Sequence, residues 1–148
     1  MSGEETLYLA AAAAFQAVMV GHFAMRRWRF AAAVRHGWVV YALSVPFAAL
    51  SLVLLAAGST WWLWLGGFVY LAWAAFGFLV EYRLQLAWRT PVRWGVFGPY
   101  VALYLATSAL YWWPAARLSL GAWLVLTVCF GIGTTLNVAS HRREAAHP

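Results

Sequence analysis

Residues 61–94 read WWLWLGGFVYLAWAAFGFLVEYRLQLAWRTPVRW, and this stretch decides the fold. It opens with a cluster of aromatic residues and continues through about twenty apolar residues, a length that crosses the hydrocarbon core of a bilayer as one helix. It then runs without a break into Glu81, Arg83 and Gln85 and stops at Pro91. The pattern predicts a membrane-spanning helix over residues 61–87 that enters at one interface and extends beyond the other.

One face of this helix changes from small to polar along its length. Residues at spacings of three and four share a helix face, and this spacing joins Ala74, Gly77, Glu81, Gln85 and Trp88. A carboxylate at a membrane boundary is expected to point into the protein, because contact with lipid is costly. The small residues before it let a second helix approach closely. We therefore expect the polar chemistry to gather around Glu81.

The composition is that of an integral membrane protein. Of the 148 residues, 65% are hydrophobic and only 9% are charged, whereas a soluble domain carries about a quarter charged residues. The net charge of +6 rests on arginine, and without lysine the chain cannot hold a retinal-like aldehyde as a Schiff base. The single cysteine, Cys129, excludes a disulfide scaffold and a cysteine-rich metal site. The length allows one transmembrane domain, residues 1–148.

The hydropathy pattern predicts an all-α bundle of five transmembrane helices. The spans are expected at residues 7–25, 37–57, 61–87, 99–113 and 119–140. In the first span, a stripe of small residues that ends at Gly21 suits close helix packing, and Gln16 is expected to form a hydrogen bond to another helix. In the second span, Pro46 should bend the helix, because proline leaves the carbonyl of Ala42 without its donor.

The arginines predict the orientation of the bundle. Nine of the ten fall on one side of the predicted spans, and only Arg117 falls on the other. The nine are Arg26, Arg27, Arg29, Arg35, Arg83, Arg89, Arg93, Arg142 and Arg143. Cytoplasmic loops carry the excess of positive charge, so we expect the N-terminus outside and the C-terminus in the cytoplasm. We expect the inner membrane of a bacterium or archaeon, and no nucleic-acid partner for these loop arginines.

Polar side chains are expected to gather at the cytoplasmic ends of the spans. The members of this polar cluster are His22, Glu81, Gln85, Asn137 and His141. Histidines beside a carboxylate can ligate a metal ion, and two facing histidines can hold a haem. No pair of residues has the spacing of a known metal motif, so we favour hydration among the headgroups or pairing with arginine. From the sequence we assign no metal site, no cofactor and no catalytic residue.

A second set of candidates carries hydroxyl groups along one face of the fourth span and one face of the second. The set comprises Tyr41, Ser44, Ser51, Tyr100, Tyr104, Thr107 and Tyr111. Such stripes either bound a cavity for an apolar ligand with a polar handle, such as a lipid, a quinone or a tetrapyrrole, or form hydrogen bonds between packed helices. Because the rings are bulky, we hypothesise an elongated ligand between the two spans, with Tyr104 nearest its centre.

Residues 97–113, FGPYVALYLATSALYWW, are similar to a stretch of the tryptophan-rich sensory (translocator) family. That family also has five spans and abundant tryptophan, and the resemblance implies a pocket for porphyrins or sterols. In the family this motif opens the second span, whereas here it opens the fourth, and the doubled proline before it is reduced to Pro91. We therefore do not assign the chain to the family.

Three classes of function remain open. The first is a membrane protein that binds a lipid or another hydrophobic molecule, or that packs as an accessory subunit against itself or within a larger complex. The second is a small oligomeric transporter or channel in which Glu81 gates the pore or couples transport as a proton or cation site. If Glu81 instead forms an ion pair with arginine, it only fixes the geometry of a loop. The third is a membrane enzyme with Glu81 and His141 as acid and base. With no catalytic motif and no charge at mid-membrane, we favour the first class and a role other than catalysis.

Overall fold

The computed structural model describes residues 1–88 and 91–144, and their side chains up to residue 139. This part of the chain is helical and contains no β-strand. The elements are α1 (Gly3–Trp28), α2 (Phe30–His36), α3 (Trp38–Ala42), α4 (Ser44–Ala56), α5 (Trp61–Phe78), the π-helical turn η1 (Leu79–Arg83), α6 (Trp94–Trp112), α7 (Ala115–Leu118) and α8 (Leu120–Glu144).

Four of the described helices are long and apolar enough to cross a membrane. They are Gly3–Trp28, Trp38–Ala56, Trp61–Arg83 and Leu120–Ala139. The all-α bundle predicted from the sequence is confirmed in this form. α6, with 19 residues, is not among the four. Its first turns contain Gly95, Gly98, Pro99 and Tyr100, which are less apolar than the rest of the helix.

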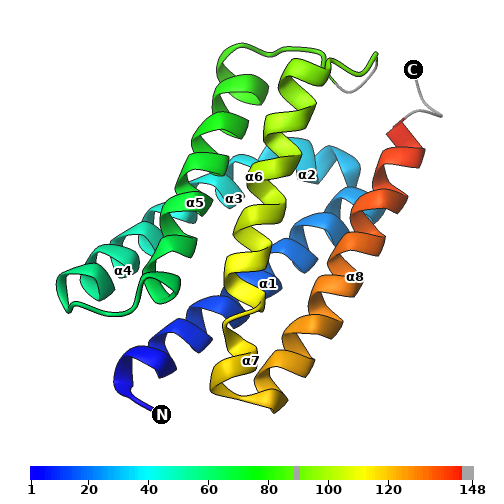
Figure 1. Ribbon diagram of the computed structural model, residues 1–148. Coiled ribbons are helices and arrows are strands. Elements are labelled where there is room, and N and C mark those ends of the chain that lie inside the picture. The colour runs from blue at the N-terminus through cyan, green and yellow to red at the C-terminus, as the bar shows by residue number, and fades with distance from the viewer. Residues whose placement is uncertain (89–90, 145–148) are drawn as a thin grey trace.

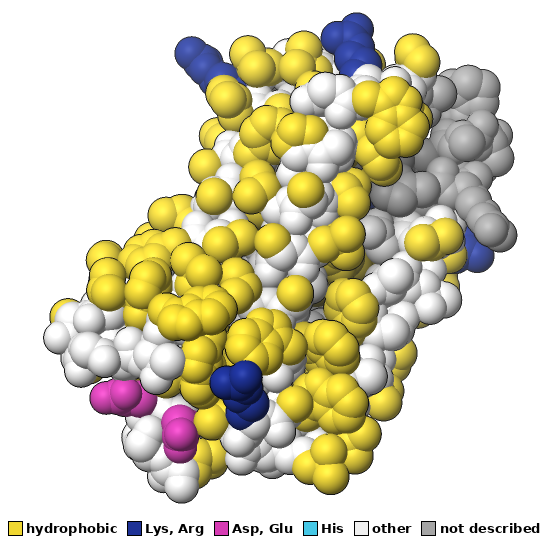
Figure 2. Space-filling view, in the orientation of Figure 1, with side chains coloured by type: hydrophobic (Ala, Val, Ile, Leu, Met, Phe, Trp, Pro, Cys, Tyr) yellow, Lys and Arg dark blue, Asp and Glu magenta, His cyan; other side chains and the backbone are white. Residues whose placement is uncertain are grey.

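The long helices alternate in direction (Figure 1). α1, α5 and α8 run one way, and α3–α4 and α6 return, so the two ends of the described chain lie at opposite ends of the bundle. α5 packs against α4 and α6, and α1 packs mainly against α8. Hydrophobic side chains cover the middle of the face shown in Figure 2, and charged side chains lie toward the ends of the molecule. This distribution matches a protein embedded in a membrane.

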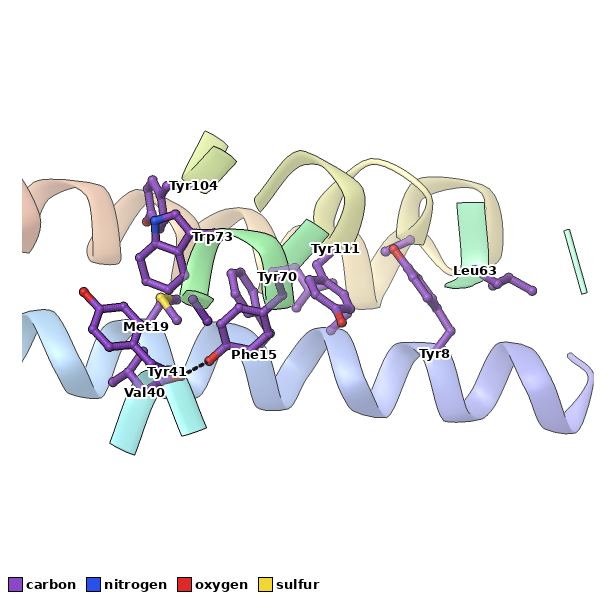
Figure 3. Packing of buried hydrophobic residues seen from close by; sticks show 14 of the residues in the cluster. Tyr8, Phe15, Met19, Val40, Tyr41, Leu63, Tyr70, Trp73, Tyr104 and Tyr111 are labelled. Carbon is purple, nitrogen blue, oxygen red and sulfur yellow. Dashed lines mark hydrogen bonds between the residues drawn. The ribbon is translucent and has the colours of Figure 1, made fainter. Parts of the chain in front are cut away.

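The interior is filled by aromatic side chains from several helices (Figure 3). Phe15 of α1 stacks on Tyr111 of α6 with ring centroids 4.8 Å apart, and meets Tyr70 of α5 edge-to-face at 5.1 Å. Tyr8 donates a hydrogen bond of 2.6 Å to the carbonyl of Leu110. Lipid tails are as apolar as these rings, so close packing and satisfied hydroxyl groups hold the helices together more than the hydrophobic effect does.

Glycines of α5 set the distances between helices. A Cβ at Gly67 would overlap the Ser51 hydroxyl and the Phe47 carbonyl of α4, so the two backbones can meet here only because the residue is glycine. At Gly66, a Cβ would lie 3.3 Å from Cζ of Tyr111. Close approach was expected at Gly77 from the sequence, and the close approach at Gly66 and Gly67 was not.

The second predicted span is interrupted close to Pro46, where the sequence predicted a bend. α3 ends at Ala42 and α4 begins at Ser44, so the interruption falls less than one turn before the proline. Two side-chain hydroxyls bond to carbonyls at this break. Ser44 Oγ donates to the carbonyl of Tyr41 at 2.6 Å, and the Tyr70 hydroxyl of α5 donates to the carbonyl of Val40 at 2.6 Å (Figure 3). Both bonds satisfy backbone groups that would otherwise be costly inside a membrane.

Two expectations for α1 are wrong within this bundle. The small-residue stripe that ends at Gly21 is exposed rather than packed against a helix of the same chain. α1 meets α8 through another side, where a Cβ at Gly133 would lie 3.6 Å from Val20. Gln16 is 3% exposed, but its amide nitrogen has no hydrogen-bond partner among the described residues.

Candidate functional site

Three polar side chains from three elements meet at one end of the bundle. The hydroxyl of Tyr41, in α3, donates a hydrogen bond of 2.7 Å to Oε2 of Glu81, in η1. The same hydroxyl lies 3.4 Å from the hydroxyl of Tyr100, in α6. Tyr41 is buried, whereas Glu81 and Tyr100 are half-buried. We refer to Tyr41, Glu81 and Tyr100 as the Glu81 site.

The Glu81 site combines residues that the sequence analysis placed in two separate sets. Tyr41 and Tyr100 belonged to the hydroxyl stripes, and Glu81 belonged to the polar cluster. The expectation that Glu81 points into the protein agrees with its hydrogen bond to Tyr41.

A widened turn of helix carries Glu81. The amide of Leu84 donates to the carbonyl of Leu79 at 2.8 Å, a step of five residues instead of the four of an α-helix. One additional residue in a turn changes the direction of the side chains that follow it. π-helical turns are rare in proteins, and many of those that exist lie at functional sites. We therefore include this turn in the candidate site.

Aromatic rings surround the Glu81 site. The Trp73 ring lies 5.5 Å from the Tyr41 ring and 5.4 Å from the Tyr100 ring, centroid to centroid. Trp88 also packs on Tyr100, with centroids 5.0 Å apart. Tyr82 meets Tyr41 edge-to-face at 6.0 Å. The polar groups therefore lie in a weakly screened environment, where hydrogen bonds are stronger than in water.

Trp73 is buried beside the Glu81 site, and its indole nitrogen has no hydrogen-bond partner among the described residues. The side chain is 2% exposed. Trp73 was not predicted from the sequence as a member of this site. The signal was present, because Trp73, Gly77 and Glu81 follow one another at intervals of four residues and so share a face of a helix.

Gln85 does not continue the polar face of the helix as predicted. The helix ends at Arg83, four residues before the predicted end at residue 87, and Gln85 has a φ of 48°. This left-handed conformation is uncommon for a residue other than glycine, and it turns the chain away from the helix axis. Gln85 is exposed, whereas Trp88, which follows it, is 3% exposed and covers Tyr100.

The other members of the polar cluster lie on α1 and α8. His22 and Asn137 are half-buried on these two helices. His141 lies outside the residues whose side chains are described, so its proposed role beside Glu81 stays a prediction. Within the part of the chain that the structure describes, no group of three or more His, Cys, Asp or Glu residues is arranged to hold a metal ion.

The remaining hydroxyl residues face packed helices. Ser44 bonds to the carbonyl of Tyr41, and Thr107 bonds to the carbonyl of Leu103 at 2.8 Å. Ser51 lies against Gly67. All three side chains are buried, and their hydroxyls meet backbone or a neighbouring helix.

The rings of the fourth predicted span pack against α1, α4 and α5. Tyr104 meets Trp73 and Phe23, both with centroids 5.8 Å apart. Tyr111 stacks on Phe15 and meets Phe47 of α4 edge-to-face at 5.8 Å. Of the hydroxyl residues on α6, Tyr100 is the one that stays half-buried, so a polar ligand group can approach the stripe most readily there.

The chain was also compared with known proteins. No family model, no curated protein and no solved structure matches it. The similarity to the tryptophan-rich sensory family covers residues 97–113.

Proposed function

We propose that this protein is a membrane-embedded binding or accessory bundle that holds a lipid, or a similar hydrophobic molecule, by its polar head at the Glu81 site. The observation that carries the proposal is the hydrogen-bonded contact of Tyr41, Glu81 and Tyr100 at one end of an aromatic interior. The hydroxyl of Tyr100 can donate or accept, and the Glu81 carboxylate accepts. A molecule with a polar head and an apolar body fits such a position, with its body in the bilayer beside α6.

The proposal includes the topology. Five spans, an extracytoplasmic N-terminus and a cytoplasmic C-terminus agree with the alternating directions of the long helices and with the arginine distribution. In this arrangement α6 is the fourth span, and the Glu81 site lies near the cytoplasmic surface. The membrane is the inner membrane of a bacterium or archaeon.

Native mass spectrometry of the protein released from nanodiscs tests the binding proposal. Tyr100→Phe keeps the ring and removes the hydroxyl, and Glu81→Gln keeps the size and removes the charge. Both variants should retain less lipid than the parent protein. Tyr8→Phe is the matched control, because it removes a phenol hydroxyl near the other end of the bundle and should leave retention unchanged. Equal retention in all four proteins would contradict the proposal.

Tyr104 separates a ligand that enters the ring-lined interior from one that stays at the bundle end. Tyr104→Ala opens space beside Trp73, and Tyr104→Trp fills it. Opposite changes in retained lipid place the ligand inside. Unchanged retention in both variants, together with loss in Tyr100→Phe, places it at the Glu81 site alone.

A small oligomeric transporter or channel is the second candidate. The observation in its favour is the position of Glu81 in a π-helical turn, where the helix already departs from regular bonding. Flux of protons or monovalent cations into proteoliposomes tests this candidate, with Glu81→Gln as the variant expected to abolish flux. No flux in the parent protein would leave the binding function.

A further inference from the structure

One end of the bundle carries exposed arginines together with exposed tryptophans. The arginines are Arg29, Arg35, Arg83 and Arg93, and all four are exposed. Beside them in sequence, Trp28, Trp38 and Trp94 are 67%, 48% and 73% exposed. We call these seven residues the arginine collar. They belong to the connection around α2 and to the chain between η1 and α6.

Contacts hold the two segments of the collar together. The Tyr82 hydroxyl, in η1, donates to the carbonyl of Val34, in α2, at 3.3 Å. A Cβ at Gly37 would lie 2.7 Å from the same hydroxyl, so the start of α3 is close as well. Trp94 meets Phe97 edge-to-face at 5.5 Å, and Trp88 packs on Phe97 at 6.1 Å, which ties the start of α6 to the chain after η1.

The collar is positively charged without compensation from its own segments. Residues 26–38 and 82–94 contain no acidic residue. Glu81, just before the second segment, is half-buried and accepts a hydrogen bond from Tyr41, so it faces the interior while the four arginines are exposed. Glu4 and Glu5 lie in the first turn of α1, at the other end of the bundle, where Glu4 accepts a hydrogen bond from Ser59. Figure 2 shows the acidic side chains at that end, together with one basic side chain, and further basic side chains at the opposite end. The complementary partner is an anion.

The exposed tryptophans of the collar indicate that this anion lies at the headgroup level of the membrane. Tryptophan side chains concentrate at the headgroup level of a membrane, because the ring prefers the apolar side and its N–H prefers water. Arginine offers paired N–H donors that fit the oxygens of a phosphate group. A surface that alternates the two residue types matches a phosphate group carried on acyl chains better than a soluble phosphate.

We propose that the arginine collar is a binding surface for anionic phospholipid headgroups, such as that of phosphatidylglycerol. The phosphates bind to the guanidinium groups, and the glycerol and upper acyl chains pack against the tryptophans. This interaction is independent of the Glu81 site, and either one can exist without the other.

The first experiment needs no variant. The purified full chain is placed in nanodiscs with equal amounts of phosphatidylglycerol and phosphatidylcholine, and native mass spectrometry identifies the lipids that stay bound. Phosphatidylglycerol should be enriched, and the enrichment should fall as the salt concentration during preparation rises. Equal retention of the two lipids overturns the proposal, and so does a lipid-free dimer, which would assign the surface to a second copy.

Variants then locate the binding. Arg29→Gln/Arg35→Gln and Arg83→Gln/Arg93→Gln should each weaken the preference for phosphatidylglycerol, by about fivefold for every arginine removed, the equivalent of about 1 kcal/mol. Arg117→Gln is the matched control, because Arg117 lies at the opposite end, 5.0 Å from the centroid of the Trp113 ring. If all variants weaken the preference alike, only net charge matters and the collar is not a site.

A soluble competitor separates lipid from free phosphate. Glycerol 3-phosphate at millimolar concentration should not displace phosphatidylglycerol, because it lacks the acyl chains that lie against Trp28, Trp38 and Trp94. Displacement by this compound contradicts the proposal and assigns the collar to soluble phosphate compounds.

Discussion

The ring of Tyr41 lies against Gly77, where a Cβ would come within 2.7 Å of Cε1 and 2.9 Å of the hydroxyl oxygen. Gly77 is one helical turn before Glu81, so the same face of the chain that supports the ring also accepts its hydrogen bond. The glycine thus determines how closely α3 approaches α5, and the carboxylate determines where the hydroxyl points.

We expect Gly77→Ala to destabilise the protein by about 1–3 kcal/mol, because the added methyl group has to displace the Tyr41 ring from a packed position. Thermal unfolding in detergent measures the effect. Gly131→Ala is the control, since nothing lies within 4 Å of a Cβ there. If Gly77→Ala unfolds at the same temperature as Gly131→Ala, the contact between Tyr41 and Gly77 does not constrain the packing.

Glu81→Ala should destabilise the bundle by about 1–3 kcal/mol, because it removes the acceptor of the Tyr41 hydroxyl. A double-mutant cycle with Tyr41→Phe isolates the bond between the two residues. In the Tyr41→Phe background, the cost of Glu81→Ala should be smaller. A cost that is the same in both backgrounds would show that Glu81 stabilises the protein through other neighbours.

Tyr70→Phe tests the hydrogen bond at the break between α3 and α4. The variant keeps the ring and removes the donor to the carbonyl of Val40, so we expect a loss of about 0.5–1.5 kcal/mol in unfolding free energy. Tyr111→Phe is the control, because it removes a phenol hydroxyl from another buried tyrosine, which packs on Phe15 away from the break between α3 and α4. Equal unfolding temperatures for the two variants would mean that another donor replaces Tyr70.

The helices could be predicted from the sequence because their signal is local. A long apolar run specifies a helix without reference to its neighbours, and Pro46 marks a break by its own chemistry. α2 was missed inside a segment treated as a connector, although its three alanines, Ala31 to Ala33, are strong helix formers. The end of α5 was placed too late. Leu84 and Gln85 are compatible with helix, and the chain leaves it there through a π-helical turn that local propensity does not encode.

The candidate site could be predicted only in part, because it depends on contacts between helices. Helical periodicity shows which residues share a face, but not which faces meet. Tyr41 was assigned to a hydroxyl stripe and Glu81 to the polar cluster, and their contact depends on how closely α3 packs against α5 at Gly77. The burial of Trp88 depends on the left-handed conformation of Gln85, which spacing along a presumed helix cannot reveal.

The topology is tested by single cysteines in a Cys129→Ala background, placed at Ser2 or Ala146 and treated with an impermeant thiol reagent in intact cells. We expect labelling at Ser2 but not at Ala146, because five spans put the two termini on opposite sides and the arginine-rich loops favour the cytoplasm. Four spans, with α6 on the surface, would put both termini on one side, so that both positions are labelled or neither is. Labelling at Ala146 alone would reverse the orientation. Permeabilised cells, in which both positions should react, are the control for the reactivity of each cysteine.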